Sequence, residues 1–176
     1  MSERVQQDSQ QNPTQATIDQ RLADWGEISD LFQLVSGNEL AVVAFGAMSR
    51  YIRLESDLSA RMRELVVLRT AFLMGLNYCV GRHLPIARAA GIDADEINVL
   101  GEADRPVVAA SFTEVEREVL DAVDVLASGS VLAPAQLRAL DAALQRSGVV
   151  DLILTVGWYR LIGCVINGFQ LEVPAQ

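Results

Sequence analysis

Apolar residues recur at every third or fourth position through most of this 176-residue chain. This spacing places them on one face of an α-helix, whereas a half-buried strand would alternate apolar and polar residues. Residues 65–68 and 71–72 are apolar, so the helix that contains them is apolar most of the way round, as a helix surrounded by others is. No alternating segments flank a β-hairpin signal. The sequence therefore predicts an all-α fold, a bundle of about six to eight helices.

Capping residues predict where these helices begin. Asp93 with Glu96, and Thr113 with Glu116, have the spacing of a capping box, in which two side chains satisfy free N–H groups at a helix start. Further start signals are Asp57 or Ser59, Asn77 and Pro134. The remaining helices are predicted over residues 40–51, 61–75, 78–90 and 149–169, with one more from residue 134 to just before 148.

The first 18 residues differ from the rest because they are rich in Gln, Ser and Asn. Such a segment buries too little apolar surface to order itself, so we expect a disordered tail over 1–18 and a single helical domain over 19–176. Residues 1–20 contain no apolar core segment and do not resemble a signal peptide. Two cysteines, Cys79 and Cys164, are too few for a secreted disulfide scaffold. We therefore expect a cytoplasmic protein.

The net charge of −9 limits the possible partners. The 14 basic residues are scattered, so the sequence argues against nucleic acids and against an anionic membrane surface. The apolar segment 149–171 is interrupted by Asp151 and Arg160, and a membrane span needs about 20 uninterrupted residues. It is better interpreted as a core or interface helix. An apolar content of 51% is high for one small domain, so we expect a homo-oligomer.

The chemistry predicted from the sequence centres on Cys79 and His83. If Asn77 caps the helix that follows, Cys79 lies in its first turn, where the helix dipole lowers the pKa of a thiol. His83, the sole histidine, lies four residues later on the same face, within reach of the sulfur. Alternatively, Cys79 is a small packed residue and His83 a hydrogen-bonded core histidine.

Glu64 precedes this segment by one helix and lies in an apolar stretch. If its side chain faces the core, burial raises its pKa and suits it to moving protons. A thiol, an imidazole and a carboxylate together can form an activated-nucleophile relay or perform acid–base catalysis. Alternatively, Glu64 pairs with Arg61, Arg63 or Arg69 on a solvated face.

The segment from Leu58 to Gly91 resembles the carboxymuconolactone decarboxylase family, which includes the AhpD-type alkyl hydroperoxidases. The likeness rests on residues 63–69, on Cys79 and His83, and on residues 85–91. Those peroxidases place a glutamate nineteen residues before a histidine and the peroxidatic cysteine four before it, as Glu64, Cys79 and His83 are placed here. The resemblance implies an AhpD-like helical bundle that assembles as a trimer or a hexamer.

Three positions depart from the patterns of the family's two branches. The peroxidases keep a resolving cysteine three residues before the peroxidatic one, where this chain has Leu76. An intramolecular Cys-x-x-Cys disulfide cycle is therefore impossible at this site. The decarboxylase branch resembles Tyr-Glu-Trp-x-x-His here; Tyr78 and His83 fit it, but Cys79 and Val80 replace the glutamate and the tryptophan.

Three functions remain open. The leading hypothesis is a peroxiredoxin-type thiol enzyme that reduces hydroperoxides through Cys79, with His83 and Glu64 as proton relay and an external thiol, or Cys164, as reductant. The second is a cofactor-free acid–base decarboxylase, isomerase or hydrolase for a small lactone or carbonyl acid, whose negative charge an arginine holds. The third is a non-catalytic helical oligomer.

Several other residues receive a predicted role. Tyr78, Arg82 and Trp158 are candidates for substrate binding, although Trp158 and Tyr159 fit the core or an interface better. Cys164, in an apolar helix, is interpreted as a core residue. No zinc-ligand spacing and no Gly-rich phosphate loop occur, so we expect no metal and no cofactor.

Overall fold

The computed structural model describes residues 29–102 and 112–171, so the predicted tail over 1–18 lies outside it. The chain divides into two compact units, one up to Arg50 and one from Tyr51 onward. The described residues form seven α-helices and one π-helix, and they contain no strand. The predicted all-α class is confirmed.

The first unit contains α2 (Ser29–Val35) and α3 (Glu39–Arg50). Their aromatic rings meet edge to face, because the centroids of Phe32 and Phe45 lie 5.4 Å apart with the planes at 89°. The predicted helix over 40–51 is thus confirmed as α3. The second unit opens with a π-helical turn, η2 (Tyr51–Glu55), which the sequence did not predict.

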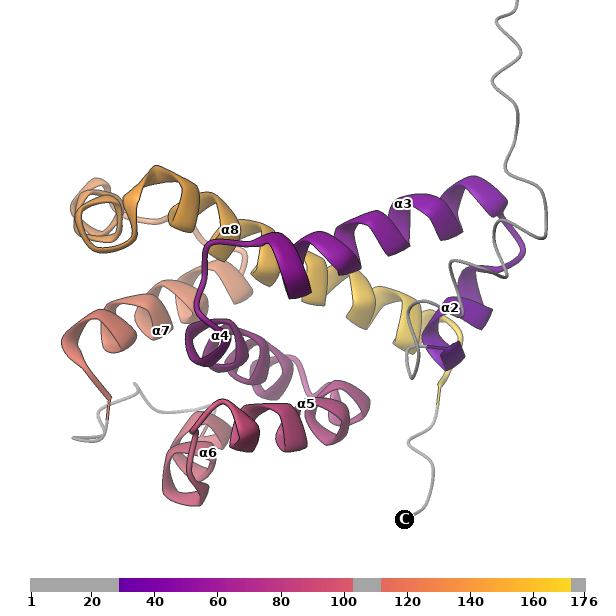
Figure 1. Ribbon diagram of the computed structural model, residues 1–176, viewed down its shortest axis with the longest axis horizontal. Coiled ribbons are helices and arrows are strands. Elements are labelled where there is room, and N and C mark those ends of the chain that lie inside the picture. Colours follow the sequence, from indigo (N-terminus) through magenta and orange to yellow (C-terminus); the bar gives the residue numbers. More distant parts are fainter. Residues whose placement is uncertain (1–28, 103–111, 172–176) are drawn as a thin grey trace, which may run out of the picture. The chain divides into compact units, whose positions relative to one another are not determined.

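Helix α4 (Ala60–Leu73) lies at the centre of the second unit (Figure 1). Its start is capped by Ser59, whose hydroxyl accepts a hydrogen bond from the backbone of Met62. The helices around it, all in contact with α4, are α5 (Asn77–Ala89), α6 (Ala94–Gly101), α7 (Glu114–Ala127) and α8 (Pro134–Gly168). The prediction of a helix surrounded by others is confirmed.

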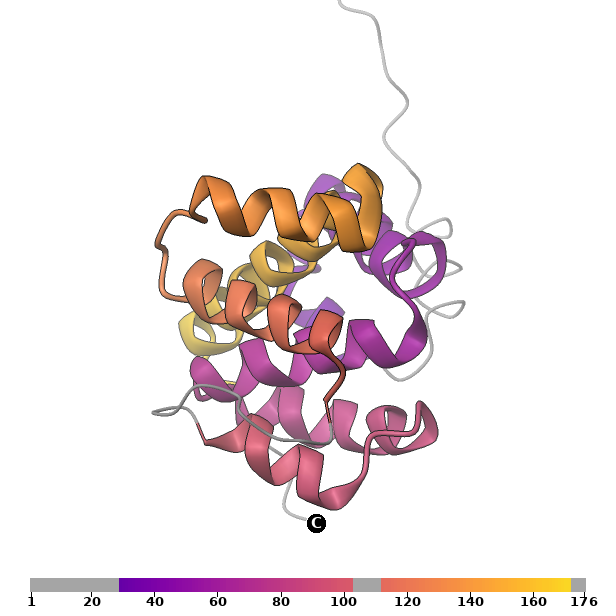
Figure 2. The ribbon, with the colours of Figure 1, turned by 90° about the vertical axis from the view of Figure 1, so that its left-hand side faces the viewer.

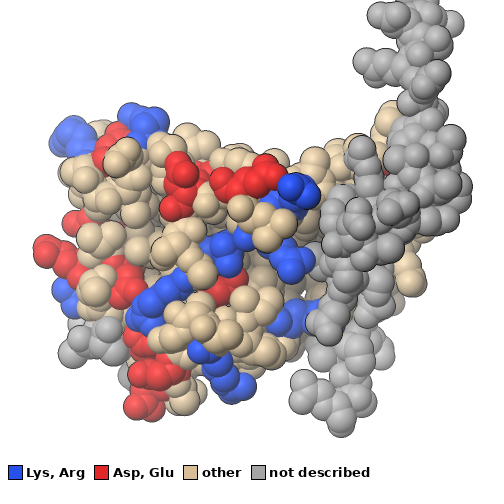
Figure 3. Space-filling model, in the orientation of Figure 1, with Lys and Arg blue, Asp and Glu red and all other residues tan. Residues whose placement is uncertain are grey.

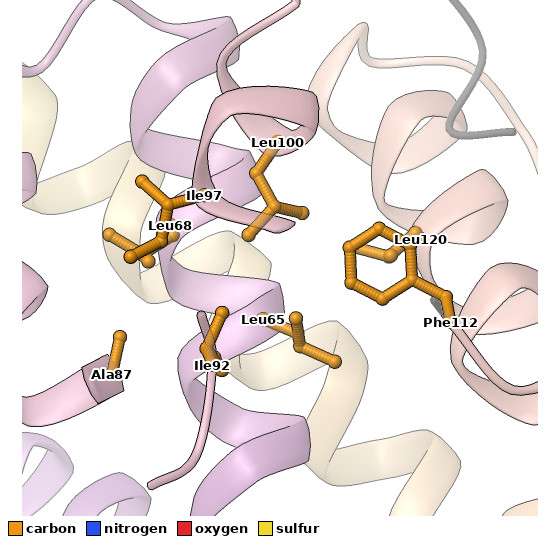
Figure 4. Packing of buried hydrophobic residues seen from close by; sticks show 8 residues of the cluster. All are labelled: Leu65, Leu68, Ala87, Ile92, Ile97, Leu100, Phe112 and Leu120. Atoms are coloured by element: carbon orange, nitrogen blue, oxygen red, sulfur yellow. The ribbon is translucent and has the colours of Figure 1, made fainter. Parts of the chain in front are cut away.

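Two apolar clusters pack against different faces of α4. In the first, Leu65 and Leu68 of α4 lie among residues from α5, α6, α7 and the adjoining loops (Figure 4). In the second, Val66 of α4 packs with α7 and α8, where Val119 and Leu152 are fully buried. Because residues on several sides of α4 are buried, the helix holds Glu64 in a fixed position.

Both predicted capping boxes are confirmed, at Asp93 with Glu96 and at Thr113 with Glu116. Arg61 joins them: its guanidinium lies 2.6 Å from Glu96 Oε1 and 2.7 Å from Glu116 Oε1. One side chain of α4 therefore ties together the starts of α6 and α7. Such charge-assisted hydrogen bonds between half-buried and buried groups are stronger than neutral ones.

Helix α8 is bent, as its orange and yellow halves show in Figure 2. The bend lies at Gln145, which has a φ of 58° and a ψ of 168°, a region that favours glycine. The sequence predicted a break just before Gly148, and the structure places it three residues earlier. Gly148 serves a different purpose: a Cβ there would lie 2.9 Å from the Cβ of Leu144.

By length and composition alone, α8 is apolar enough to cross a membrane, but 56% of its most apolar window is buried within the protein. The two charged residues of α8 that follow Gly148 form hydrogen bonds within the protein. Asp151 accepts hydrogen bonds from the hydroxyl of Tyr51 and from the backbone of Asp57, and Arg160 donates to two carbonyls at the end of α7. We therefore interpret α8 as a core helix.

Candidate functional site

Glu64 faces the interior from the first half of α4, with only 2% of its surface exposed. Its Oε2 lies 2.7 Å from Nδ1 of His83, and its Oε1 lies 3.3 Å from Nε of Arg63. The alternative of a solvated surface pair is therefore wrong. A buried carboxylate of this kind needs hydrogen-bonding partners, and His83 and Arg63 supply them.

The other two arginines considered as partners of Glu64 serve the fold instead. Arg61 joins the capping boxes, as described above. Arg69 is completely buried and binds both carboxylate oxygens of Asp124, at 2.7 and 2.8 Å, together with the carbonyls of Leu100 and Glu102. With its donors used in this way, Arg69 is not available to hold an anionic substrate.

His83 lies on α5 and is hydrogen-bonded at both ring nitrogens. Nδ1 faces Glu64, and Nε2 lies 2.8 Å from the hydroxyl of Tyr159 on α8. The two rings also pack edge to face, with centroids 5.3 Å apart. A carboxylate only accepts hydrogen bonds, so Nδ1 carries the proton, and Nε2 of a neutral ring then accepts from the phenol.

Tyr159 is the site residue that the sequence interpretation missed, since it was assigned to packing. Its hydroxyl reaches His83 from 76 residues further along the chain. A signal was present: Asp151, Thr155 and Tyr159 recur every four residues in the mainly apolar second half of α8, and all three are buried. Burial, followed by the negative charges of Glu64 and Cys79, raises the pKa of Tyr159, so its phenol is neutral.

Cys79 lies in the first turn of α5, as expected, but the predicted cap is wrong. Leu76 occupies the capping position, and no side chain there accepts a hydrogen bond from the helix start. The predicted low pKa of the thiol is also wrong, because burial raises it to about 12. Only 4% of the surface of Cys79 is exposed, so desolvation disfavours its thiolate more than the helix terminus favours it.

The relation between the thiol and the imidazole also differs from expectation. Cys79 and His83 are four residues apart on α5, so they lie on one face of the helix. However, both ring nitrogens are hydrogen-bonded to oxygen atoms, those of Glu64 and Tyr159, and neither is bonded to the sulfur. The negative charge that Cys79 can carry nevertheless acts on Tyr159, which links the thiol electrostatically to this network.

The remaining predicted residues are placed as follows. Tyr78 and Trp158 are buried at 7% and 8% exposure, and Arg82 is exposed. Their roles in substrate binding stay predictions. Cys164 is exposed, so its assignment to the core is wrong. The described residues contain no group of three or more His, Cys, Asp or Glu side chains arranged for a metal ion.

Leu76, which occupies the position of the resolving cysteine in the AhpD-type peroxidases, is buried in the structure. Its side chain lies against the backbone of Gly163 in α8, where a Cβ would lie 3.0 Å from Leu76 Cδ2. Leucine therefore fills space between α5 and α8 at this point.

The site thus combines a carboxylate, an imidazole and a phenol in one hydrogen-bonded chain, with a protonated thiol one turn away. Such a chain moves a proton from its phenol end toward the carboxylate end without building up isolated charge. The side chain of His83 is 15% exposed, so solvent reaches part of this hydrogen-bonded group of side chains. Acidic and basic side chains mix on the face of the molecule in Figure 3.

Two solved structures share the fold. One is a protein of unknown function from Agrobacterium tumefaciens, a suggested antioxidant defence protein AhpD, at 22% identity and a TM-score of 0.70, covering 80% of this chain and 95% of that one. The other is a Cys-to-Ala variant of the debrominase Bmp8 in complex with 2,3,4-tribromopyrrole, at 13% identity and a TM-score of 0.69, covering 87% and 88%. At these identities they show the fold alone.

No curated protein matches the chain significantly. The sequence of residues 40–125 matches the carboxymuconolactone decarboxylase family, and this range contains Glu64, Cys79 and His83. Over residues 40–125 the chain is therefore similar to the carboxymuconolactone decarboxylase family, and its described residues have an AhpD-like helical fold.

Proposed function

We propose that this protein is a thiol enzyme that reduces small hydroperoxides through Cys79, with His83 and Glu64 accepting the thiol proton. The observation that carries the proposal is the 2.7 Å contact between His83 and a buried Glu64, one helical turn from the only buried cysteine of the described residues. A weak nucleophile needs a nearby base, and a base is effective when a third group orients it.

The raised pKa of Cys79 determines how such a reaction proceeds. The resting thiol is protonated, so the base removes the proton as the peroxide arrives. The sulfur then attacks one peroxide oxygen, the O–O bond breaks, and Cys79 becomes a sulfenic acid. The leaving alkoxide takes up the proton that the base received, which yields one alcohol for each peroxide.

The catalytic cycle closes through an external thiol. Leu76 cannot form a disulfide with Cys79, and Cys164 is exposed whereas Cys79 is buried. A small thiol attacks the sulfenic sulfur and releases water, and a second thiol equivalent reduces the mixed disulfide. The structural likeness to the debrominase makes a brominated pyrrole a second substrate to test beside the hydroperoxides.

A second function, acid–base catalysis on a small lactone or carbonyl acid, is favoured by a different observation. Both nitrogens of His83 are bonded to oxygen acids and neither to the sulfur, so the relay is complete without Cys79. The positive charges of Arg53 and Arg63 act on Tyr159, although burial and the negative charges outweigh them. In this reaction they hold the carboxylate of the substrate.

Turnover measurements on three variants separate these functions. The purified protein is incubated with an alkyl hydroperoxide and a small thiol, and the sulfenic acid is trapped at Cys79. The proposal expects turnover that Cys79→Ser abolishes, that His83→Ala lowers strongly and that Cys164→Ser leaves unchanged. Full activity in Cys79→Ser would exclude it, and a lactone turned over by Cys79→Ser but not by His83→Ala would establish the second function.

We also propose a cytoplasmic homo-oligomer, a trimer or a hexamer, that binds neither nucleic acid nor membrane. Its support is the exposed face of α8, where Val150, Ile153 and Leu161 are each more than 40% exposed at helical spacing. Apolar side chains in a row suit a subunit interface. Light scattering gives the subunit number; a monomer would refute this assembly, and an oligomer inert to both substrate classes would favour a non-catalytic role.

A further inference from the structure

We infer that the Tyr159 hydroxyl is an autoinhibitory latch, which occupies Nε2 of His83 and keeps this nitrogen from the Cys79 thiol until the hydrogen bond opens. The inference rests on the proposed function, in which His83 accepts the thiol proton, and it adds the regulation of that step. It gives a role to a residue of α8, which no motif of the sequence connects to the catalytic segment.

Both ring nitrogens of His83 are occupied in the structure. Nδ1 lies 2.7 Å from Oε2 of Glu64, and Nε2 lies 2.8 Å from the Tyr159 hydroxyl. The rings of His83 and Tyr159 pack edge to face with their centroids 5.3 Å apart, which holds the phenol against the imidazole. An imidazole with both nitrogens hydrogen-bonded takes no proton from a third group unless one of these two bonds opens.

The strength of the two hydrogen bonds decides which of them opens. Glu64 is a carboxylate with 2% exposure, so its hydrogen bond with Nδ1 is charge-assisted. The bond from the Tyr159 phenol is neutral, and neutral hydrogen bonds are about half as strong as charge-assisted ones. The phenol therefore leaves first, and its departure frees Nε2, the nitrogen that carries no proton and can act as the base.

Cys79 is placed to use this nitrogen once it is free. The thiol lies on α5 one turn before His83 and on the same face of the helix. While the latch is closed, the imidazole does not take the thiol proton, and burial raises the pKa of Cys79 to about 12. The closed state therefore keeps the nucleophile as an unreactive thiol, and its reaction begins only after the latch has opened.

The rate at which iodoacetamide alkylates Cys79 at neutral pH, followed by mass spectrometry of its peptide, tests the inference. The peptide readout separates Cys79 from the exposed Cys164. Tyr159→Phe removes the hydroxyl and keeps the ring, so it should raise the rate about two- to tenfold, the effect of one neutral hydrogen bond. An unchanged or lower rate in Tyr159→Phe would overturn the inference.

A double variant separates the latch from a general loosening of the packing. If Tyr159→Phe acts by freeing Nε2, its gain should vanish in a His83→Ala background, because the freed base is then missing. Tyr51→Phe is the matched control: it removes a phenol hydroxyl that donates to Asp151, eight residues before Tyr159 on α8. It should keep the wild-type rate. A gain that persists without the imidazole, or an equal gain in Tyr51→Phe, would overturn the inference.

The NMR signal of Nε2 tests the latch without alkylation, because His83 is the sole histidine. While the latch is closed, Cys79→Ala should leave the Nε2 resonance unchanged. In the Tyr159→Phe background, the same substitution should shift it, because the thiol is then the partner of the free nitrogen. A shift in the wild-type background, or none in Tyr159→Phe, would overturn the inference.

Neither measurement uses a peroxide. A protein that passes these tests but reduces no hydroperoxide therefore refutes the proposed function alone. A protein that reduces hydroperoxides through Cys79 but fails these tests refutes the latch alone.

Discussion

Replacing Glu64 with glutamine removes the negative charge beside His83 and keeps the shape of the side chain. The amide oxygen of the new side chain can still accept from Nδ1, so a charge-assisted hydrogen bond becomes a neutral one. Charged hydrogen bonds contribute about 1.5–3 kcal/mol and neutral ones about 0.5–1.5 kcal/mol. At 2% exposure for Glu64, water does not compensate for the difference.

The expected loss is therefore about 1.25 kcal/mol of imidazolium stabilisation, or roughly an eightfold lower kcat/KM for the hydroperoxide. Initial rates of peroxide consumption at saturating thiol measure it. Glu96→Gln is the matched control, because Glu96 is also a buried carboxylate that binds a cation, Arg61, outside the site. Glu96→Gln should keep the kcat/KM of the wild type. If a folded Glu64→Gln variant also keeps its kcat/KM within threefold of the wild type, the charge of Glu64 has no part in catalysis.

Three further predictions concern the fold and the missing resolving thiol. Gly148→Ala should lower the free energy of unfolding, measured in urea, by about 1–3 kcal/mol, because the new Cβ meets Leu144 at 2.9 Å. Gly157→Ala should raise it by about 0.5–1 kcal/mol, because no atom lies within 4 Å of the new Cβ. Equal effects of the two substitutions would contradict this packing. Burial raises the pKa of Glu116, but hydrogen bonds from Arg61 and Thr113 outweigh burial and hold the pKa below its ordinary value. Glu116 therefore stabilises the fold above about pH 4.3, and this contribution is lost as the pH falls through the pKa of the folded state. Urea unfolding between pH 7 and 3 should show a shallower acid loss in Glu116→Gln, and an unchanged curve would count against the Arg61 link. Leu76→Cys should form a disulfide with Cys79 after peroxide treatment, seen as the loss of two thiols, at a stability cost of roughly 2 kcal/mol; a persistent sulfenic acid would show that the two sulfurs cannot meet.

Features encoded locally were predictable from the sequence. The capping boxes at Asp93 and Thr113 depend on side chains three residues apart, and they form as predicted. The surrounded helix α4 could be recognised because its apolar residues cover most of its circumference. The inward position of Glu64 and its contact with His83 followed from the family spacing, which fixes two successive helices relative to each other.

Features that depend on competition or on distant packing were not predictable. At Cys79 the helix terminus and burial act on the thiol in opposite directions, and only the structure shows that burial is stronger. Tyr159 reaches His83 because the bend at Gln145 and the packing of α8 against α4 bring it there. Cys164 was misassigned because an apolar helix can still leave one face exposed, and the sequence does not tell which.

The claim that His83 is held between a carboxylate and a phenol can be tested directly, because it is the sole histidine in the chain. A two-dimensional ¹⁵N–¹H NMR spectrum of the folded protein reports which ring nitrogen carries the proton. The structure predicts a proton fixed on Nδ1 and an unprotonated, hydrogen-bonded Nε2 whose shift changes in Tyr159→Phe. A proton fixed on Nε2, or one that averages between the two nitrogens, would contradict the relay.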